Sequence, residues 1–302
     1  MPRLAFLFGA GASYGAGSIL PKPPPLGGGL YEELRAMFPA TWGNFPPDLD
    51  EQFRRNFETG MDALWRSGVE ESQPLWEIGR YFATFLPNPA EPSCYLRLIR
   101  LLESCNLIDR CGFATLNYDC LFDLDLHAAG FGYTDGPRTG PFRHPLSVRF
   151  WKLHGGSNVL RGGSGTWSGN RFVNVGSIYS GPVKYVMPTQ VIEHFERDDL
   201  PPMLSLYAPG KETPIAPEAV AEIRQAWANW VKHSDIVVVI GARIRVGDDH
   251  IYRPLKKANG TIWYVGGRDD FEIKRPVVRL GKRFEAALDG ALTTRMEELA
   301  VR

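Results

Sequence analysis

Apolar runs separated by helical patterns recur along this chain and predict a parallel sheet. The runs occupy residues 4–8, 111–116, 148–153, 235–240 and 261–265. The fourth is rich in β-branched residues, which is typical of a strand buried on both faces of a parallel sheet. Apolar residues at helical spacing mark 217–233 and 281–300. Strands that alternate with helices predict an α/β fold, with a Rossmann-like, doubly wound and mostly parallel sheet.

The stretch between the first and second runs has the spacing of helices. Apolar and aromatic residues recur there at helical intervals, as at Phe53, Phe57 and Met61. We therefore expect a single domain over residues 1–302, with a helical insertion at about 28–108. Aromatic side chains exposed on this insertion would mark an interface with a partner. Residues 157–187 are glycine-rich and alternate in polarity, which predicts short hairpins.

Small and polar residues follow the apolar runs, at 9–13, 117–119, 154–156 and 241–249. Ligands of open parallel sheets bind at the carboxyl ends of the strands, so these turns are the expected site. In the first turn, Gly9 and Gly11 would let backbone N–H groups approach a phosphate. The dinucleotide fingerprint would place a third glycine at position 14, where Tyr14 stands. Taken alone, this turn fits a glycine-rich turn of any α/β core equally well.

Composition narrows the class of protein. The chain has 302 residues, of which 44% are hydrophobic and 23% charged, and its net charge is zero. Those values describe an ordinary globular protein, without the positive charge that favours nucleic acids or membrane surfaces. We therefore expect no direct nucleic-acid binding and no membrane binding. The densest basic run, which we interpret as a solvated face, consists of Lys274, Arg275, Arg279, Lys282 and Arg283.

The compartment and the metal content follow from two further features. Gly9 cuts the N-terminal apolar run too short for a secretion signal, and no stretch is long enough to span a membrane, so we expect a cytoplasmic protein. The cysteines stand far apart without a CxxC pair, which disfavours a zinc site and indicates reduced thiols. No metal is expected. The cysteines are Cys94, Cys105, Cys111 and Cys120.

Segments at the expected strand ends resemble those of the sirtuin superfamily, and more closely those of bacterial sirtuin-like NAD hydrolases of anti-phage defence. The resemblance rests on Gly-Ala-Gly-Ala-Ser at 9–13, Thr-Leu-Asn-Tyr-Asp at 115–119 and Lys-Leu-His-Gly at 152–155. A less exact match is Ile-Gly-Ala-Arg at 240–243, together with Asp248. The order and the wide spacing of these segments match the family along nearly the whole chain.

The resemblance implies a site with NAD as substrate. Asn117 would contact the nicotinamide ribose and position the attacking water, and His154 would act as general base. Asp119 would face the nicotinamide or its ribose. A histidine suits this role because it titrates near neutral pH, and an uncharged amide can hold water near a developing cation. The residues implied for NAD binding are Gly9, Ala10, Gly11, Ala12, Ser13, Thr115, Gly155, Gly241, Arg243 and Asp248.

The chain also departs from the family. It lacks the four-cysteine zinc module of sirtuin deacylases, which disfavours lysine deacylation and favours NAD hydrolysis. Arg243 stands where the family often has serine, and it could bind a phosphate bidentately or point away. Gly266 replaces an asparagine after the last core strand, where adenosine recognition would differ. Asp248 or Asp249 could reach a ribose hydroxyl, or serve as a helix N-cap.

The resulting hypothesis is an NAD⁺ glycohydrolase that yields nicotinamide and ADP-ribose and depletes NAD in anti-phage defence. Such an effector would be restrained in a homo-oligomer or by a partner protein, for example a hexameric ATPase or helicase or an Argonaute-type protein. The alternative from another class is a non-catalytic sensor of NAD or ADP-ribose, or a binding subunit of a larger complex. A protein deacylase or ADP-ribosyltransferase is a third and less favoured hypothesis.

Overall fold

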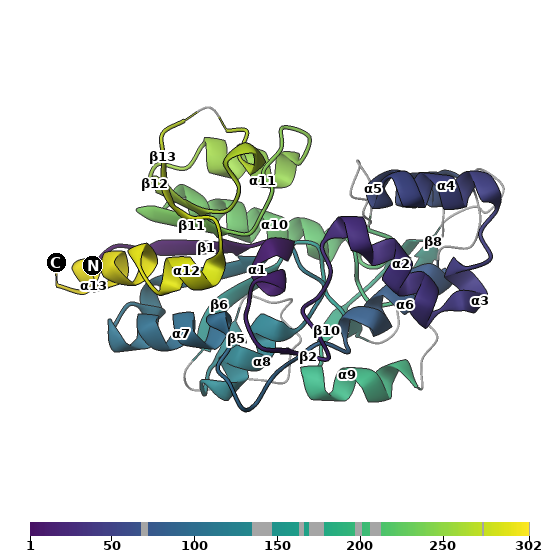
Figure 1. The fold of residues 1–302 in the computed structure, drawn as a ribbon, viewed down its shortest axis with the longest axis horizontal. Coiled ribbons are helices and arrows are strands. Elements are labelled where there is room, and N and C mark those ends of the chain that lie inside the picture. The colour runs from purple at the N-terminus through teal and green to yellow at the C-terminus, as the bar shows by residue number, and fades with distance from the viewer. Residues whose placement is uncertain are drawn as a thin grey trace.

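A seven-stranded sheet in which all strands run parallel forms the centre of the molecule. The computed structural model describes residues 1–67, 72–134, 147–162, 166–168, 178–196, 201–205, 213–273 and 275–301. The strand order is β13-β12-β11-β1-β4-β6-β5 (Figure 1). The expected doubly wound α/β fold is therefore confirmed. The strands are β1 (Leu4–Phe8), β4 (Cys111–Thr115), β5 (Gly132–Thr134), β6 (Ser147–Lys152), β11 (Ile236–Ile240), β12 (Thr261–Val265) and β13 (Val277–Gly281).

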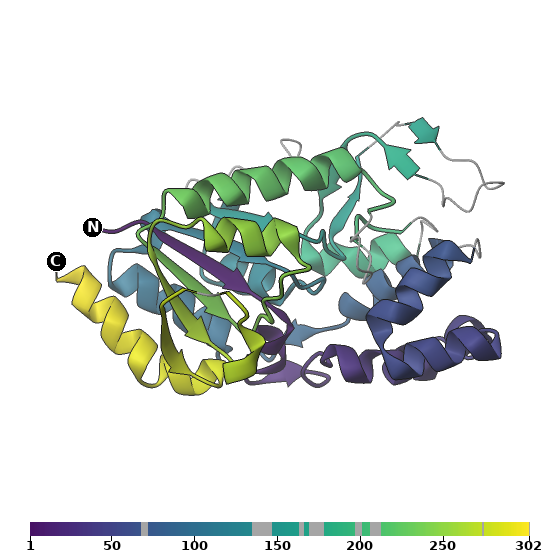
Figure 2. The same ribbon diagram turned by 90° about the horizontal axis from the view of Figure 1, so that it is seen from above.

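Alternate side chains of the strands enter two separate cores. Phe6 and Phe8 of β1 pack on one face, while Ala5 and Leu7 pack on the other, and all are fully buried. The first core is closed by α7 (Cys94–Ser104), α8 (Leu121–Ala128), α12 (Phe284–Leu288) and α13 (Ala291–Ala300). The second core is closed by α10 (Pro217–Lys232) and α11 (Asp249–Lys256), so helices cover both faces (Figures 1 and 2).

The strand order places a topological switch point beside β1. From β1 the chain first builds β4 and then β6 on one side, and it later returns to place β11 on the other side. Ligands of open α/β sheets bind at such a point, outside the carboxyl ends of the strands. The short helix α1 (Ala10–Tyr14) follows β1 directly at this place.

Five helices between residues 27 and 82 form a lobe at the end of the molecule opposite the termini, whereas α7, which also lies within 28–108, packs on the sheet (Figure 1). Trp42 lies at the centre of the lobe, with ring centroids 5.4 Å from Phe53 and 5.9 Å from Phe57. The described aromatic side chains between 28 and 108 are buried or half-buried, so none of them marks an exposed interface with a partner. The lobe consists of α2 (Gly27–Met37), α3 (Pro39–Trp42), α4 (Pro47–Arg55), α5 (Phe57–Arg66) and α6 (Ser72–Phe82).

Short strands lie outside the main sheet. Hairpins were predicted within 157–187, and in the described part of this segment β7 pairs antiparallel with β10, and β8 with β9. Some residues of that segment lie outside the described ones. The bounds are β2 (Ile19–Leu20), β3 (Leu86–Pro87), β7 (Val159–Arg161), β8 (Thr166–Ser168), β9 (Ile178–Ser180) and β10 (Val183–Tyr185), and helix α9 spans Pro188–Phe195.

The C-terminal region differs from its prediction. A single helix was expected over 281–300, but α12 and α13 are separate helices, and Gly290 between them has φ −144° and ψ −107°. Strand β13, which was not expected, precedes them. It is an edge strand with half-buried and exposed positions, so its sequence lacks the continuous apolar run of a central strand.

Two arginines of the basic run near the C-terminus, Arg275 and Arg279, form hydrogen bonds with backbone carbonyl groups. Arg275 donates hydrogen bonds to the carbonyl oxygens of Leu255, Ala258 and Gly260, and so closes the C-terminal end of α11. Arg279 donates to the carbonyl oxygen of Arg268. Lys274 lies outside the described residues. Among the described residues, no helix combines the length and the hydrophobicity that crossing a bilayer requires.

All four cysteines are buried as thiols. Burial raises the pKa of Cys94 to about 11 and that of Cys120 to about 12. Both thiols are therefore protonated at neutral pH, which makes them poor nucleophiles.

Candidate functional site

The glycine turn after β1 is seated against the end of β11. The N–H of Gly9 donates to Ile240 O at 3.0 Å, and that of Gly11 donates to Gly241 O at 2.9 Å. A Cβ atom on Gly9 would lie 2.4 Å from Ala242 Cα, and one on Gly11 would lie 2.9 Å from Gly241 O. The glycines are therefore needed for this close packing, and their N–H groups are committed to protein acceptors.

The turn after β11 completes this contact. Gly241 has φ +61°, and a Cβ atom there would lie 2.1 Å from Ala12 N, so only glycine fits. Arg243 then leaves the turn for the surface, where its Nε lies 3.1 Å from an oxygen of Asp270. Asp248 is half-buried at the N-cap position of α11. The Arg243 side chain is therefore exposed and engaged with Asp270, while the preceding Ala242 packs against Gly9.

Asn117 lies beneath the glycine turn with its amide oriented by the backbone. The Nδ2 atom donates to Gly9 O at 3.0 Å and to Ser13 Oγ at 2.8 Å. Because a carbonyl oxygen only accepts, the NH₂ end must face Gly9. Thr115 contributes from the end of β4, where its Oγ1 accepts the backbone N–H of Asn117 at 3.0 Å. Tyr95 also forms a hydrogen bond with the Asn117 side chain. The NH₂ group is thus committed to the protein, and the amide oxygen is the acceptor of this side chain.

Asp119 is a buried carboxyl group in the same network. Burial raises its pKa, against the lowering effects of hydrogen bonds from Ser13 and the Leu121 N–H and of the charge of Lys152. Ser13 also lies 3.0 Å from the hydroxyl of Tyr95, which comes from α7. Burial and then the charge of Asp119 raise the pKa of Tyr95, so the phenol stays neutral. The glycine turn, the Asn117 turn and α7 thus share one hydrogen-bonded cluster.

Lys152 joins the Asn117 turn to β6 from within the protein. Its Nζ lies 2.9 Å from an oxygen of Asp123, and the two side chains are 0% and 1% exposed. The same ammonium donates to Asn158 Oδ1 at 2.8 Å and to Asp119 O at 3.1 Å. Burial lowers the pKa of Lys152, but the neighbouring negative charges outweigh it and the net direction is upward. Lys152 is therefore a charged anchor for the loop that carries Asn117.

His154 follows β6 and is placed by the backbone around it. Gly155 has φ +73°, and a Cβ atom there would lie 1.8 Å from Met203 O. The N–H of Ser205 donates to His154 O at 2.9 Å. The turn therefore depends on glycine at 155 and on the strand-like segment 203–205 packed against it.

Arg224 of α10 supports the same turn from the second core. Its Nε donates to Leu153 O at 3.0 Å, and its Nη2 donates to Ser205 Oγ at 2.9 Å. Burial lowers the pKa of Arg224, while the charges of Tyr118 and Asp248 raise it in part. A positive charge therefore lies behind the His154 turn.

The side chain of His154 contacts a second histidine. The Nε2 atoms of His154 and His250 are 2.8 Å apart, and the ring centroids are separated by 5.0 Å. Both rings are half-buried. His250 is the second residue of α11, so this contact joins the turn after β6 to the helix after β11.

The structure thus places the predicted residues in two linked groups. Asn117 and Asp119 share a network with Ser13, and His154 lies at the end of the neighbouring strand. Ser157 ties the two turns, since its N–H and Oγ donate to Tyr118 O at 2.9 and 2.8 Å. The sequence interpretation missed two members. Tyr95 lies within the expected helical insertion, where no local pattern singles it out, and the only signal at His250 is its position just after a turn at a strand end.

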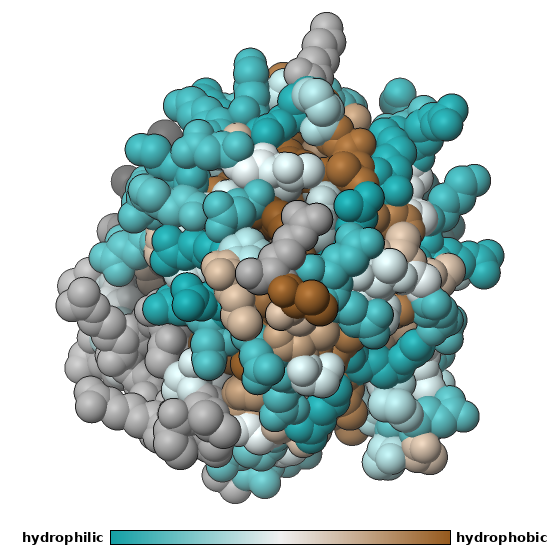
Figure 3. Space-filling view, turned by 90° about the vertical axis from the view of Figure 1, so that its left-hand side faces the viewer, coloured by the Kyte–Doolittle hydropathy of each residue, from teal (hydrophilic) through white to brown (hydrophobic). Residues whose placement is uncertain are grey.

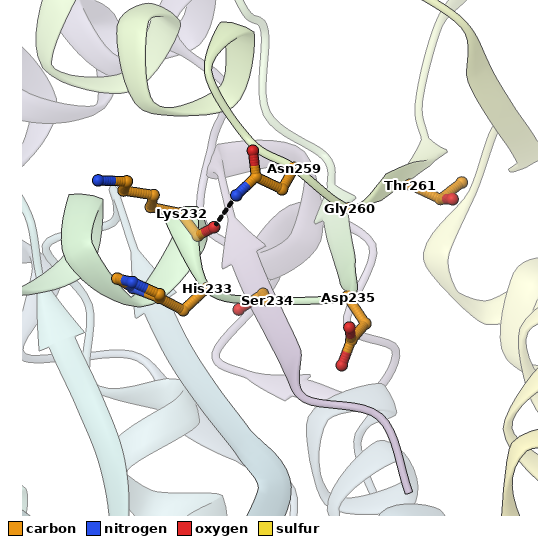
Figure 4. Close-up of a pocket in the computed structure, with 7 residues that line it drawn as sticks. All are labelled: Lys232, His233, Ser234, Asp235, Asn259, Gly260 and Thr261. Carbon is orange, nitrogen blue, oxygen red and sulfur yellow. Dashed lines mark hydrogen bonds between the residues drawn. The ribbon is translucent and has the colours of Figure 1, made fainter.

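A hollow lies at the opposite ends of the strands. It measures about 420 Å³ and lies at the amino ends of β11 and β12, with Lys232, His233 and Asn259 among its lining residues (Figure 4). Asn259 Nδ2 donates there to Lys232 O at 3.0 Å. The hollow is remote from the carboxyl ends of the strands, where Asn117 and His154 lie.

Figure 3 shows the end of the molecule that carries both termini, where hydrophilic side chains cover most of the surface.

When the chain is compared with known proteins, solved structures match it but protein families and curated sequences do not. No family model matches the chain, and no curated protein matches it. A structure from work on the mechanism and regulation of Sir2 enzymes is 15% identical with a TM-score of 0.45, over 100% of this chain and 94% of that one. A Sir2 homologue in complex with NAD is 15% identical with a TM-score of 0.42, over 98% and 90%. Sir2 bound to an acetylated peptide is 15% identical with a TM-score of 0.42, over 99% and 94%.

At this identity and these TM-scores, the likeness transfers no activity, ligand or residue role to this chain. The parallel sheet and its strand order stand on the structure itself.

Proposed function

We propose that this protein is an NAD⁺ glycohydrolase that cleaves NAD⁺ to nicotinamide and ADP-ribose. The observation that carries the proposal is the orientation of Asn117. Its NH₂ group is held by Gly9 O and Ser13 Oγ. We assign the amide oxygen, as the acceptor of this side chain, to a ligand at the end of β4. His154 stands at the end of the adjacent strand β6. The sequence resemblance to sirtuin-like NAD hydrolases supplies the substrate.

In the proposed reaction, the glycosidic bond breaks and its electron pair leaves with nicotinamide, which becomes neutral. The ribose carbon becomes an oxocarbenium-like centre. The Asn117 oxygen holds a water by accepting one of its hydrogen bonds, and this water attacks that carbon. The water proton passes to His154 and then to solvent. An uncharged amide suits this place because it does not form an ion pair with the developing cation.

The phosphates of NAD⁺ would lie at the switch point beside α1. The Gly9 and Gly11 N–H groups already donate to Ile240 and Gly241, so they do not supply the phosphate contacts. The support for this part of the proposal is the position of the turn beside β1. The role of the glycines is to bring the turns after β1 and β11 into contact.

Asn117→Ala and His154→Ala test the proposal through nicotinamide release from NAD⁺. We expect each to lower the rate by at least about a hundredfold, which is the scale of a lost general base or of a lost positioning group. Asn259→Ala and His233→Ala are matched controls, because they remove the same side chains at the exposed opposite edge. Equal activity of all four variants would contradict the assignment of the site.

A non-catalytic sensor of NAD or ADP-ribose is the second candidate. The departures at Arg243 and Gly266 from the family pattern favour it, and Arg243 pairs at the surface with Asp270. A sensor would bind NAD⁺ in calorimetry, would keep that binding in His154→Ala, and would release no nicotinamide. Product formation by the wild-type protein would exclude this candidate.

We also propose that the enzyme acts as an NAD-depleting effector in anti-phage defence, a role that rests on the sequence resemblance. An enzyme that consumes a central cofactor must be restrained in the resting cell. The restraint would come from a second copy of the chain or from a partner such as a hexameric ATPase or an Argonaute-type protein. Nicotinamide release that rises when a candidate partner is added to the purified protein is the expected result.

A further inference from the structure

The contact between His154 and His250 limits the two facing Nε2 atoms to one proton between them. A hydrogen bond between two ring nitrogens needs one N–H donor and one bare acceptor. At 2.8 Å the two Nε2 atoms therefore share a single proton. The pair can be neutral, with complementary tautomers, or it can carry one positive charge. A second positive charge would place an N–H on both facing atoms and would break the contact.

Charged residues stand on each element that carries or supports the pair. Arg224 of α10 lies behind the His154 turn and donates to the carbonyl of the preceding residue. On α11, Asp248 lies at the N-cap, and Asp249 pairs with Arg253 at 2.6 Å. On β6, Lys152 is neutralised by Asp123 at 2.9 Å. A second positive charge on the pair would add to the charge of Arg224 behind the same turn.

We propose that His250 is a positioning residue for His154 and receives its proton during the reaction. The proposal rests on the glycohydrolase function. In the resting pair His154 carries its proton on Nε2 and donates to His250. When the attacking water gives its proton to His154 Nδ1, the Nε2 proton moves to His250. His154 stays neutral, and the positive charge rests on the ring farther from the reacting water.

This arrangement has a physical advantage over a single imidazole. The proton leaves the water while positive charge is present on the ribose, so a cation on His154 would oppose that charge. Transfer to His250 increases the separation and spreads the charge over a charge-assisted hydrogen bond. The pair is thus a stronger base than either ring alone, and its protonation belongs to both rings together.

His250→Gln separates proton transfer from simple positioning. Glutamine can keep a hydrogen bond to His154 Nε2, but it cannot accept the proton. We expect the rate of nicotinamide release to fall about ten- to hundredfold. The acid limb of the pH–rate profile should also shift to lower pH, because a lone imidazole is a weaker base than the pair. His233→Gln, an exposed histidine at the opposite edge, should change neither quantity.

A titration of the histidine rings by NMR, without NAD⁺, tests the pair independently of the reaction. We expect His154 and His250 to report one common protonation step in the wild-type protein, and His154 to titrate at lower pH in His250→Gln. Thermal unfolding shows whether the variant is folded, and His250→Asn is the substitute if it is not. Independent titration of the two rings, or an unchanged pH profile in His250→Gln, overturns the proposal. A common step without any nicotinamide release would instead leave the pair in place and refute the glycohydrolase.

Discussion

Asn117 and His154 follow neighbouring parallel strands, yet the protein holds them in different ways. Asn117 is buried and bonded through its amide to Gly9 and Ser13, within a network that reaches Tyr95 and Asp119. His154 is half-buried, and its carbonyl oxygen accepts the N–H of Ser205. Its ring meets the equally half-buried ring of His250.

The difference indicates a division between a fixed and an adjustable half of the site. Its hydrogen bonds and its burial leave the Asn117 amide a single orientation, which suits the role that we propose for it, the positioning of a water molecule. The half-buried His154 ring instead lies against a second imidazole, with which it can exchange a proton. Lys152 connects the two halves, because it stands on β6 and binds the loop after β4.

Lys152→Met breaks this connection and should have the largest effect. It leaves Asp123 as an uncompensated buried charge, for which we expect a loss of about 3–5 kcal/mol in the free energy of unfolding. Chemical denaturation measures this change. The exposed control Lys232→Met should be neutral, and adding Asp123→Leu to Lys152→Met should restore part of the loss. If Lys152→Met were as stable as Lys232→Met, Lys152 would not be the anchor described here.

Asp125 on α8 makes the free energy of unfolding depend on pH. It accepts a hydrogen bond from Ser93, and burial raises its pKa from 3.8 to about 6. The folded state therefore keeps this proton while the unfolded state loses it, so stability falls as pH rises from about 4 to 6. By neutral pH the loss is about 3 kcal/mol. Asp125→Asn should lack this loss, so its stability relative to the wild type should increase between pH 4.5 and 7. If the difference in the free energy of unfolding between Asp125→Asn and the wild type did not change with pH, the raised pKa of Asp125 would be contradicted.

Ser13→Ala tests the network around Asn117. The hydroxyl accepts from Asn117 and contacts Tyr95, so its removal leaves buried polar groups without a partner. We expect a loss of about 1–3 kcal/mol in the free energy of unfolding and a lower rate of nicotinamide release. Ser104→Ala removes an exposed hydroxyl that bonds only within its own helix, and it should be close to neutral. Full activity and stability in Ser13→Ala would mean that the Asn117 amide is held by Gly9 alone.

Arg253→Ala should have the smallest effect. It breaks an exposed ion pair with Asp249 on the helix that carries His250. Such pairs contribute about 0.3–0.5 kcal/mol, so thermal unfolding should hardly change. A large change in the pH–rate profile of this variant would show that the charge of Asp249, rather than the His154 pairing, governs His250.

The central strands and the turns after them could be predicted from the sequence because the signals are local. The apolar runs at 4–8 and 235–240 define buried strands, and the polar residues that follow define strand ends. The expected position of Asn117 and His154 at adjacent strand ends follows from the parallel arrangement alone.

Tertiary contacts account for what the sequence did not reveal. His250 meets His154 across the site, 96 residues away in the chain, and no local pattern encodes that pairing. The glycines at 9 and 11 fit a phosphate-binding turn and a packing turn equally, and only the contact with Gly241 distinguishes these roles. Helix α11 was missed because Pro254 lies inside it, where a proline normally indicates an end.

The most direct test of the glycohydrolase is product analysis after incubation of the purified protein with NAD⁺, alone and with candidate partner proteins, in the absence of any acylated peptide. The account predicts nicotinamide and ADP-ribose in equal amounts, with both products lost in Asn117→Ala. Absence of nicotinamide under all of these conditions, despite NAD⁺ binding in calorimetry, would contradict it and would favour the sensor.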